Sequence, residues 1–107
     1  MSAIVSRAKE EIKNMEFGRK IHSIFENIDF IDSVISKYLK NWTINRISKT
    51  DLSLMRLAVY EMKYNDSVPV GATINEIVDL AKIYSGEKDP AYINGVLGSI
   101  SRSGALE

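Results

Sequence analysis

Two tyrosines and a lysine flank one predicted connection between helices, and their side chains suit contact with nucleic acid. Tyr84, Lys88 and Tyr92 lie on both sides of the segment that holds Gly86 and Pro90. Aromatic rings can stack on unpaired bases and an ammonium group can neutralise a phosphate, as in single-stranded RNA binding. In the alternative interpretation, one or both rings pack against the protein and expose only the hydroxyl. Both interpretations stay open, and Tyr84, Lys88 and Tyr92 are candidate RNA-binding residues.

Polar residues also interrupt the apolar stripes of the predicted helices. Arg56 and Glu61 lie beside two apolar stripes of one helix, where they could form a structural ion pair, or where the arginine could extend its charge to the surface. Contact with a partner is the alternative, so both are candidate partner-binding residues. Asn75 and Asn94 lie in the first turns of neighbouring predicted helices, where we expect their amides to bond backbone groups across the contact.

Catalysis and metal binding find little support in the sequence. The chain has no cysteine and a single histidine, His22, which lies beside an apolar stripe and suits a surface or packing role. A Ser/His/Asp arrangement, a glycine-rich phosphate loop and a zinc-protease HExxH pattern are all missing, as is any metal-ligand spacing. The sequence therefore predicts a protein that is not an enzyme and uses no metal or cofactor.

Composition limits the possible partners. The 107 residues are enough for one domain, and 14 basic residues balance 14 acidic ones. RNA binding must therefore come from a local patch or from a partner rather than from net charge. No apolar run approaches the roughly 20 residues of a membrane span, and no signal peptide opens the chain. We expect a cytoplasmic protein that does not interact with membranes.

Helices must position these candidate residues, because apolar residues recur with a period near 3.6 and sustained alternation is missing. The third stripe extends from Ile31 to Trp42, and the fourth helix is apolar on two sides, as expected of a central helix. The sequence predicts an all-α fold, a compact bundle of five to six helices around one core. The stripes fall within residues 4–15, 17–28, 31–42, 52–62, 74–81 and 93–100.

Local signals mark the ends of the last three predicted helices. Ser48, with Asp51 three residues later, resembles a capping box at the start of the fourth helix. Gly86 should end the fifth helix in the left-handed conformation that glycine readily takes, and Asp89 with Pro90 should begin the last one.

Two glycines, Gly95 and Gly98, lie inside the last predicted helix. Each weakens the helix by roughly 1 kcal/mol relative to alanine. We therefore expect a close backbone approach to a neighbouring helix at these positions.

Several separated motifs resemble one family in the same order. Residues 42–102 resemble the C-terminal part of the NusB family of bacterial transcription antitermination factors, and residues 17–41 resemble the preceding helices more weakly. The motifs are Trp42 with Arg46-Ile47, Asp51, the run Met55-Arg56-Leu57-Ala58-Val59-Tyr60-Glu61-Met62, Val68-Pro69, Ile74-Asn75-Glu76 with Asp79-Leu80-Ala81-Lys82, and Tyr92-Ile93-Asn94-Gly95-Val96-Leu97.

This resemblance implies an all-helical fold of two small packed bundles and a function in transcription. Members of the family bind the boxA segment of nascent single-stranded RNA as a heterodimer with NusE, a ribosomal small-subunit protein. They help RNA polymerase pass terminators, as part of the transcription elongation complex. The resemblance also implies that Asp51 faces NusE, that Tyr84 and Tyr92 lie near the RNA-facing turn, and that a cation at Lys88 favours RNA.

The N-terminus departs from the family pattern. Family members usually open with an arginine-rich helix that contacts RNA, whereas Arg7 and Lys9 give only a weak echo of it here, although both are candidate RNA contacts. Fewer phosphate contacts mean weaker RNA binding. We expect a shortened or atypical member, with one NusB-like domain over residues 1–102 and a vector-derived tail over 103–107. The alternative is a truncated protein-interaction module with little direct RNA binding that associates with itself, for example as a homodimer.

Overall fold

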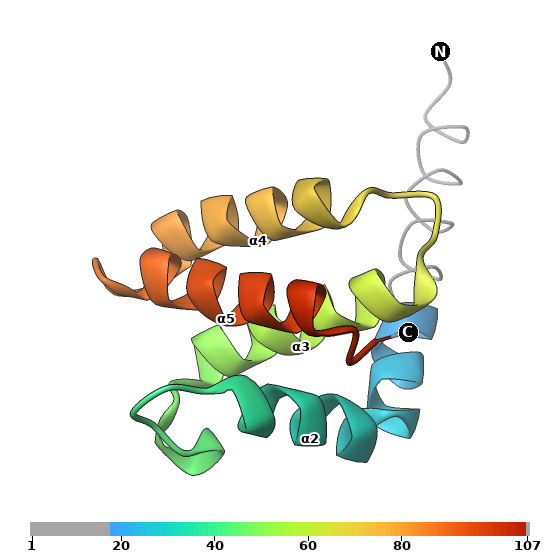
Figure 1. Ribbon diagram of the computed structural model, residues 1–107, viewed down its shortest axis with the longest axis horizontal. Coiled ribbons are helices and arrows are strands. Elements are labelled where there is room, and N and C mark those ends of the chain that lie inside the picture. Colours follow the sequence, from blue (N-terminus) through green and yellow to red (C-terminus); the bar gives the residue numbers. More distant parts are fainter. Residues whose placement is uncertain (1–17, 107) are drawn as a thin grey trace, which may run out of the picture.

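The computed structural model describes residues 18–106, and the regular secondary structure of this part of the chain consists of helices, without a strand (Figure 1). Residues 18–26 are helical. They are followed by α2 (Ile28–Tyr38), the short 3-10 helix η1 (Ile44–Arg46), α3 (Lys49–Tyr64), α4 (Val70–Tyr84) and α5 (Asp89–Ser103). The prediction of an all-α bundle of five to six helices is confirmed. The helix predicted over residues 4–15 lies outside the described residues.

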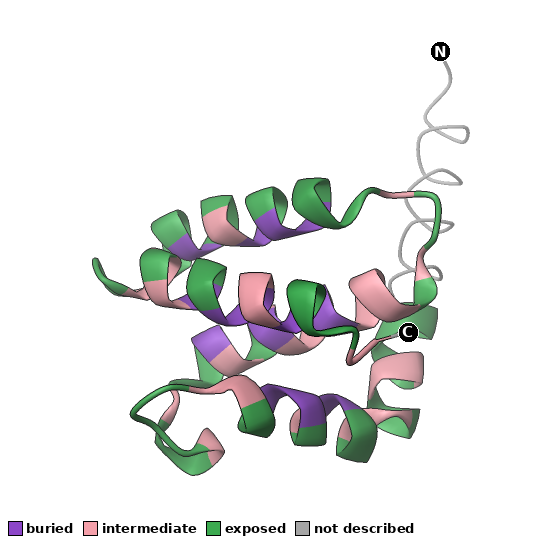
Figure 2. Cartoon of the chain, viewed as in Figure 1, coloured by how far each residue is buried: buried purple, intermediate pink, exposed green. Residues whose placement is uncertain are grey.

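The core lies where α2, α3, α4 and α5 turn their apolar stripes toward one another (Figure 2). In Figure 1, α5 lies between α4 and α2, and α3 passes behind it and contacts all three. This confirms the fourth predicted helix as a central one. Burying such side chains stabilises the fold by about 1.5–3 kcal/mol each. The fully buried residues are Ile31, Ile35, Met55, Ala58, Val59, Ala81, Ile93, Leu97 and Ile100.

The start of α3 confirms the predicted capping interaction. The Ser48 side chain accepts a hydrogen bond from the backbone N–H of Asp51, with Oγ and N 3.1 Å apart. A hydroxyl at this position satisfies one of the backbone donors that the first turn of a helix leaves without an intrahelical acceptor. The same turn carries the Asp51 side chain to the end of the bundle where the candidate site lies.

The third predicted helix is shorter than its apolar stripe suggested. The α2 helix ends at Tyr38, Leu39 is extended, and Asn41 takes a left-handed conformation with φ of 68°. Trp42 is therefore not part of the buried stripe, and 55% of it is exposed. A tertiary contact accompanies this early end of the helix. The Tyr92 hydroxyl accepts a hydrogen bond from the Lys40 N–H and donates one to the Lys40 carbonyl.

The α4 helix ends near the predicted position, but not through a left-handed glycine as expected. Gly86 is not among the left-handed residues of the described chain, and its N–H lies 3.3 Å from the Asp89 carboxylate, which accepts its hydrogen bond. The helix ends instead at Ser85, which is extended and donates its N–H to the Ala81 carbonyl at 2.9 Å. The left-handed glycine is Gly104, which ends α5 with φ of 76°.

The glycines of α5 do not mark a close approach between helices. A Cβ placed on Gly95 would meet nothing within 4 Å, and one placed on Gly98 would meet only the Arg102 side chain. The side chains of Asn75 and Asn94 are likewise exposed and make no hydrogen bond within residues 18–106. Apolar side chains of α4 and α5 pack in the shared core, and the expected amide links between the two helices are wrong.

Candidate nucleic-acid interface

Three segments that are distant in the sequence meet at one end of the bundle, on the left of Figure 1. They are the α2–η1 connection, the start of α3 and the α4–α5 turn. Several hollows open on this end, and two of them are lined by candidate residues. One, of about 400 Å³, is lined by Trp42, Arg46, Ile47, Ser48, Asp51, Lys88, Asp89 and Tyr92. The other, of about 340 Å³, is lined by Lys49, Thr50, Ser53, Leu54 and Tyr84.

Tyr92 is half-buried in the first hollow, and its hydroxyl is already bonded. It donates to the Lys40 carbonyl at 2.8 Å and accepts from the Lys40 N–H at 3.1 Å. These two bonds tie the first turn of α5 to the α2–η1 connection. Tyr92 therefore matches the interpretation in which the ring packs, and its direct contribution is to hold the neighbouring backbone.

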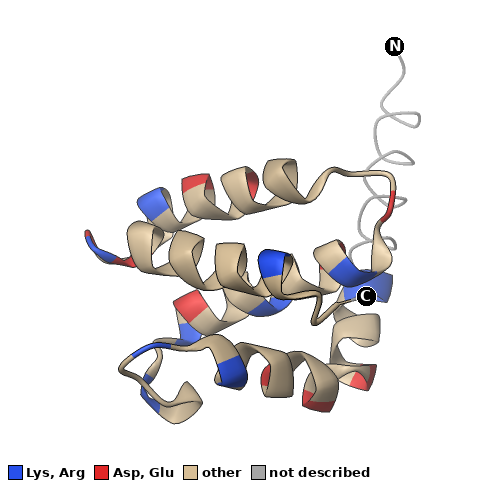
Figure 3. Cartoon of the chain, in the orientation of Figure 1, with Lys and Arg blue, Asp and Glu red and all other residues tan. Residues whose placement is uncertain are grey.

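Tyr84 and Lys88 are both exposed, Tyr84 to 68%. They line different hollows, so the two tyrosines and the lysine do not form a single cluster around the turn. Basic residues lie at this end of the molecule on the α2–η1 connection, in η1, at the start of α3 and on the α4–α5 turn, and acidic residues lie among them on the turn and at the start of α3 (Figure 3). This end therefore carries charges of both signs.

Asp51 lines the first hollow but is only 6% exposed. The Ser85 hydroxyl donates to its Oδ1 at 2.5 Å. Burial raises the pKa of the Asp51 carboxyl, the adjacent Asp89 carboxyl raises it further, and the hydrogen bonds from Ser85 and at Ser48 only partly offset this. The starts of α3 and α5 thus bring two carboxyl groups together at the floor of the hollow.

Arg56 lies further along α3 and pairs with α2. Its Nε donates to Oδ1 of Asp32 at 2.8 Å and a terminal nitrogen donates to Oδ2 at 2.7 Å. The hydrogen bond to Asp32 raises the pKa of Arg56. This is the structural ion pair that the sequence left as one alternative, and a parallel pair of bonds of this kind is the strongest geometry for it.

Glu61 lies one and a half turns beyond Arg56, near the other end of α3. Its carboxylate accepts from Lys20 Nζ and from Asn65 Nδ2, both at 2.8 Å. Burial alone would raise the pKa of Glu61, but the hydrogen bonds from Lys20 and Asn65 and the charge of Lys20 together lower it. The three candidate partner residues are therefore separated along α3, and only Asp51 lies with Lys88 and Tyr92.

The remaining candidates do not converge on a reactive centre. Arg7 and Lys9 lie outside the described residues. His22 is on the surface beside Glu26, with Nε2 and Oε1 2.8 Å apart. Within residues 18–106 no three His, Cys, Asp or Glu side chains are grouped to hold a metal ion, and no described helix is long and apolar enough to cross a membrane.

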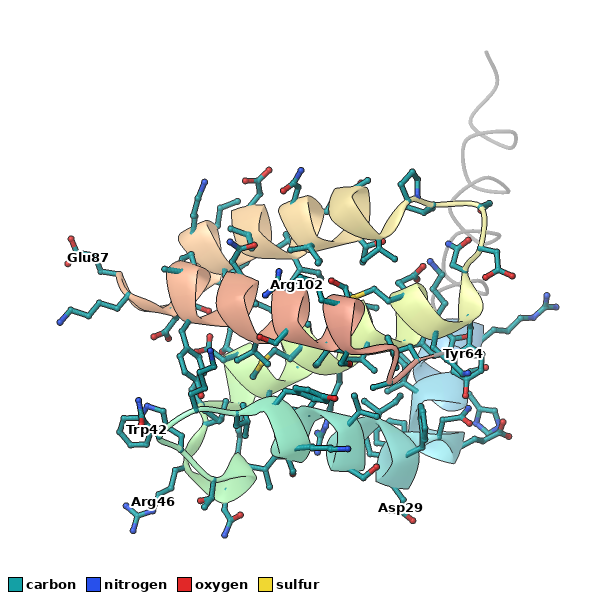
Figure 4. The ribbon with its side chains drawn as sticks, in the orientation of Figure 1. Asp29, Trp42, Arg46, Tyr64, Glu87 and Arg102 are labelled. Atoms are coloured by element: carbon teal, nitrogen blue, oxygen red, sulfur yellow. The ribbon has the colours of Figure 1, made fainter. Side chains whose placement is uncertain are left out.

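Sequence reasoning missed two side chains at this end. Trp42 projects from the α2–η1 connection and Arg46 from η1, and each lines two hollows (Figure 4). The apolar period assigned Trp42 to a buried stripe. The cluster Lys40-Asn41-Trp42, with an aromatic between polar residues and Arg46 four residues later, was the available signal for an exposed site.

Comparisons with known proteins agree on one family. The NusB family model matches residues 5–102. A transcription antitermination protein NusB of Acetivibrio thermocellus is 48% identical over 80 residues, which is 75% of this chain and 55% of that protein. One from a Thermoanaerobacter species is 43% identical over 99 residues, 92% of this chain and 66% of that protein. The solved structure of T. maritima NusB is 39% identical with a TM-score of 0.77, and the match covers 81% of this chain and 61% of that one.

Proposed function

The chain belongs to the NusB family, and on that premise we propose that it is a transcription antitermination factor of the bacterial cytoplasm. In this proposal it binds boxA-type single-stranded RNA together with NusE and joins the transcription elongation complex without catalysing a reaction. The matched relatives carry the name of transcription antitermination protein, and the chain spans 55% to 66% of the length of those two. The activity of the whole relatives is therefore extended to this chain by proposal.

One observation carries the RNA-binding part of the proposal. Exposed Tyr84, exposed Lys88 and the basic residues of the α2–η1 connection lie at the same end of the bundle (Figure 3). Their charges could contact consecutive phosphates while the aromatic ring stacks on a base. Glu87 and Asp89 flank Lys88 on the α4–α5 turn and Asp51 lies below them, so these acids reduce the local attraction and the contacts with RNA depend on where the individual cations lie.

A binding titration tests this function. Labelled boxA RNA should bind the chain with NusE present, and its affinity should fall steeply with salt because each neutralised phosphate releases counterions. Lys88→Glu should weaken binding. It should also reduce the slope of the logarithm of the affinity against the logarithm of the salt concentration by more than about one, the value for one lost phosphate contact. Arg102→Glu, a charge reversal away from this end on α5, is the matched control and should have a smaller effect. Absence of preferential boxA binding would refute the function.

Self-association is a second function that a specific observation favours. Residues 18–26 and α3 enclose an apolar hollow of about 290 Å³, lined by Ile21, Ile24, Phe25, Ile28, Ser53, Arg56 and Leu57. Phe25 is 68% exposed and Ile21 is 38% exposed. Apolar side chains that gather on one face are a usual feature of protein interfaces.

Light scattering tests this second function. A dimer should form as the protein concentration rises, and Phe25→Asp should return the protein to a monomer. Phe30→Asp, which places a charge at a ring that is 39% exposed on α2 and lies outside this hollow, is the control. A monomer at all concentrations would exclude self-association and leave the RNA-binding proposal untouched.

A further inference from the structure

Trp42 is the only tryptophan of the chain, and its ring is 55% exposed. A tryptophan that remains exposed leaves a large apolar surface in water, which a ligand can cover with a gain in free energy. The ring borders two hollows, one of about 400 Å³ and one of about 350 Å³, and Arg46 lines both. Volumes of roughly 300–1,000 Å³ are typical of ligand sites.

The backbone holds Trp42 in this position. The Tyr92 hydroxyl bonds both the N–H and the carbonyl of Lys40, two residues before the ring. Asn41 then turns the chain through a left-handed conformation, which is uncommon for a residue other than glycine. On the other side, η1 is closed by a bond of 2.9 Å from the Arg46 N–H to the Thr43 carbonyl. The backbone that carries the ring is therefore ordered before a ligand binds, which lowers the entropic cost of binding.

The larger hollow offers both charges to a ligand. Arg46 and Lys88 line it as cations, while Asp89 and the shielded Asp51 line it as acids. In Figure 4, Trp42 and Arg46 lie at the same end of the bundle, Trp42 on the α2–η1 connection and Arg46 in η1. Cations suit a phosphate, and a carboxylate suits an amine donor. A nucleotide combines an aromatic base for the indole, a phosphate for the cations and, where the base bears an amine, a donor for Asp89, whereas an acidic peptide offers neither the ring nor the donor.

We propose that the hollow beside Trp42 binds one nucleotide of single-stranded RNA, with the base stacked on the indole and the phosphate at Arg46 and Lys88. The exocyclic amine of the base donates to Asp89, so that cytosine, adenine or guanine is preferred over uracil. This inference rests on the proposed RNA-binding function and adds to it a nucleotide subsite at a residue that the RNA-facing candidates Tyr84, Lys88 and Tyr92 did not include.

The fluorescence of the intact chain tests the stacking directly, because all indole emission comes from Trp42. Titration with oligocytidylate of six nucleotides should quench this emission, and oligouridylate of the same length should bind several-fold more weakly. In an independent measurement with labelled RNA, Trp42→Ala should lose about 5- to 100-fold in affinity, the range that base–aromatic stacking supports. Trp42→Phe, which keeps a ring, should retain most of the affinity.

Control variants separate this subsite from the rest of the surface. Arg46→Ala should reduce the salt slope of RNA binding by about one, while Arg102→Ala should not. Circular dichroism should show that Trp42→Ala is folded, because the side chain contributes nothing to the buried core. If the circular dichroism spectrum of Trp42→Ala shows that the variant is unfolded, the subsite is tested by the quenching of the unaltered chain and by the comparison of the two oligonucleotides.

The outcomes distinguish this inference from the proposed function. RNA binding that leaves Trp42 emission and the affinity of Trp42→Ala unchanged would overturn the subsite alone. Quenching without a boxA preference in the presence of NusE would overturn the antitermination proposal and leave the subsite standing. Equal affinity for the two oligonucleotides, or equal quenching by an acidic peptide such as polyglutamate, would also overturn the subsite as proposed.

Discussion

The guanidinium of Arg56 and the carboxylate of Asp32 face each other across the contact between α3 and α2 and share two hydrogen bonds, of 2.8 Å and 2.7 Å. The side chains are 31% and 28% exposed, so the pair is partly shielded from water. It fixes how α2 lies against the central helix, and it explains a charged residue between two apolar stripes without a partner molecule.

Breaking this pair should lower the stability of the fold. Arg56→Met should reduce the free energy of unfolding by about 1–2 kcal/mol, because it leaves Asp32 without its donor. Arg56→Lys should recover only part of the loss, since a single ammonium cannot form the two parallel bonds. Urea unfolding of both variants, and of Arg56→Met combined with Asp32→Asn, measures the coupling. Additive losses in the double variant would show that the pair contributes nothing.

Glu61 should stabilise the protein at neutral pH. Its pKa is lowered in the folded chain, so its contribution is present above the unfolded value of about 4.3 and is lost as the pH falls through the folded value. Glu61→Gln should therefore cost about 0.5–1.5 kcal/mol at pH 7 and progressively less below about pH 4. Denaturant unfolding over this pH range is the measurement. A cost that does not depend on pH would contradict the ion pair with Lys20.

Asp51 should behave in the opposite sense. Its pKa is raised in the folded chain, so the stability it contributes is full below the unfolded value of about 3.9 and is lost as the pH rises through the folded value. Asp51→Asn keeps an oxygen for the Ser85 hydroxyl and removes the charge. The variant should gain stability relative to the original chain as the pH rises from about 4 to 7. Unfolding curves that diverge the other way would mean that the carboxylate is stabilised by its surroundings.

Gly95→Ala should make the protein more stable. The position is exposed, its φ is not left-handed, and an added Cβ would contact nothing within 4 Å. The gain should be about 0.5–1 kcal/mol, the difference in helix propensity. Gly98→Ala is the matched comparison, with a smaller gain because the new Cβ would lie 3.0 Å from an Arg102 nitrogen that must move. Thermal unfolding measures both, and destabilisation by Gly95→Ala would reveal a constraint that the fold does not show.

The apolar period predicted most of the core correctly. Ile31, Ile35, Met55, Ile93 and Ile100 were placed on buried stripes and are fully buried. The buried face of a helix is marked by apolar residues three and four positions apart, and this spacing can be read directly from the sequence. The capping interaction at the start of α3 was predictable for the same reason.

The candidate site was less predictable because it depends on distant contacts. The Tyr92 hydroxyl bonds the backbone of Lys40, 52 residues away in the chain, just after the end of α2. No local sequence pattern predicts that bond. It changes Trp42 from an expected core residue into an exposed one. Arg56 could be predicted to need an acid, but only the packing of α2 on α3 selects Asp32. Tertiary hydrogen bonds thus decided what the apolar pattern could not.

The central place of α5 has a consequence for how the protein is made. This helix is the last of the described ones to leave the ribosome, yet Ile93, Leu97 and Ile100 fill the space between α2, α3 and α4. Before residue 100 has emerged, α2, α3 and α4 can pack on one another, but the space between them lacks the side chains of α5. We therefore expect the core of the described helices to be completed only when α5 is available to fold with them.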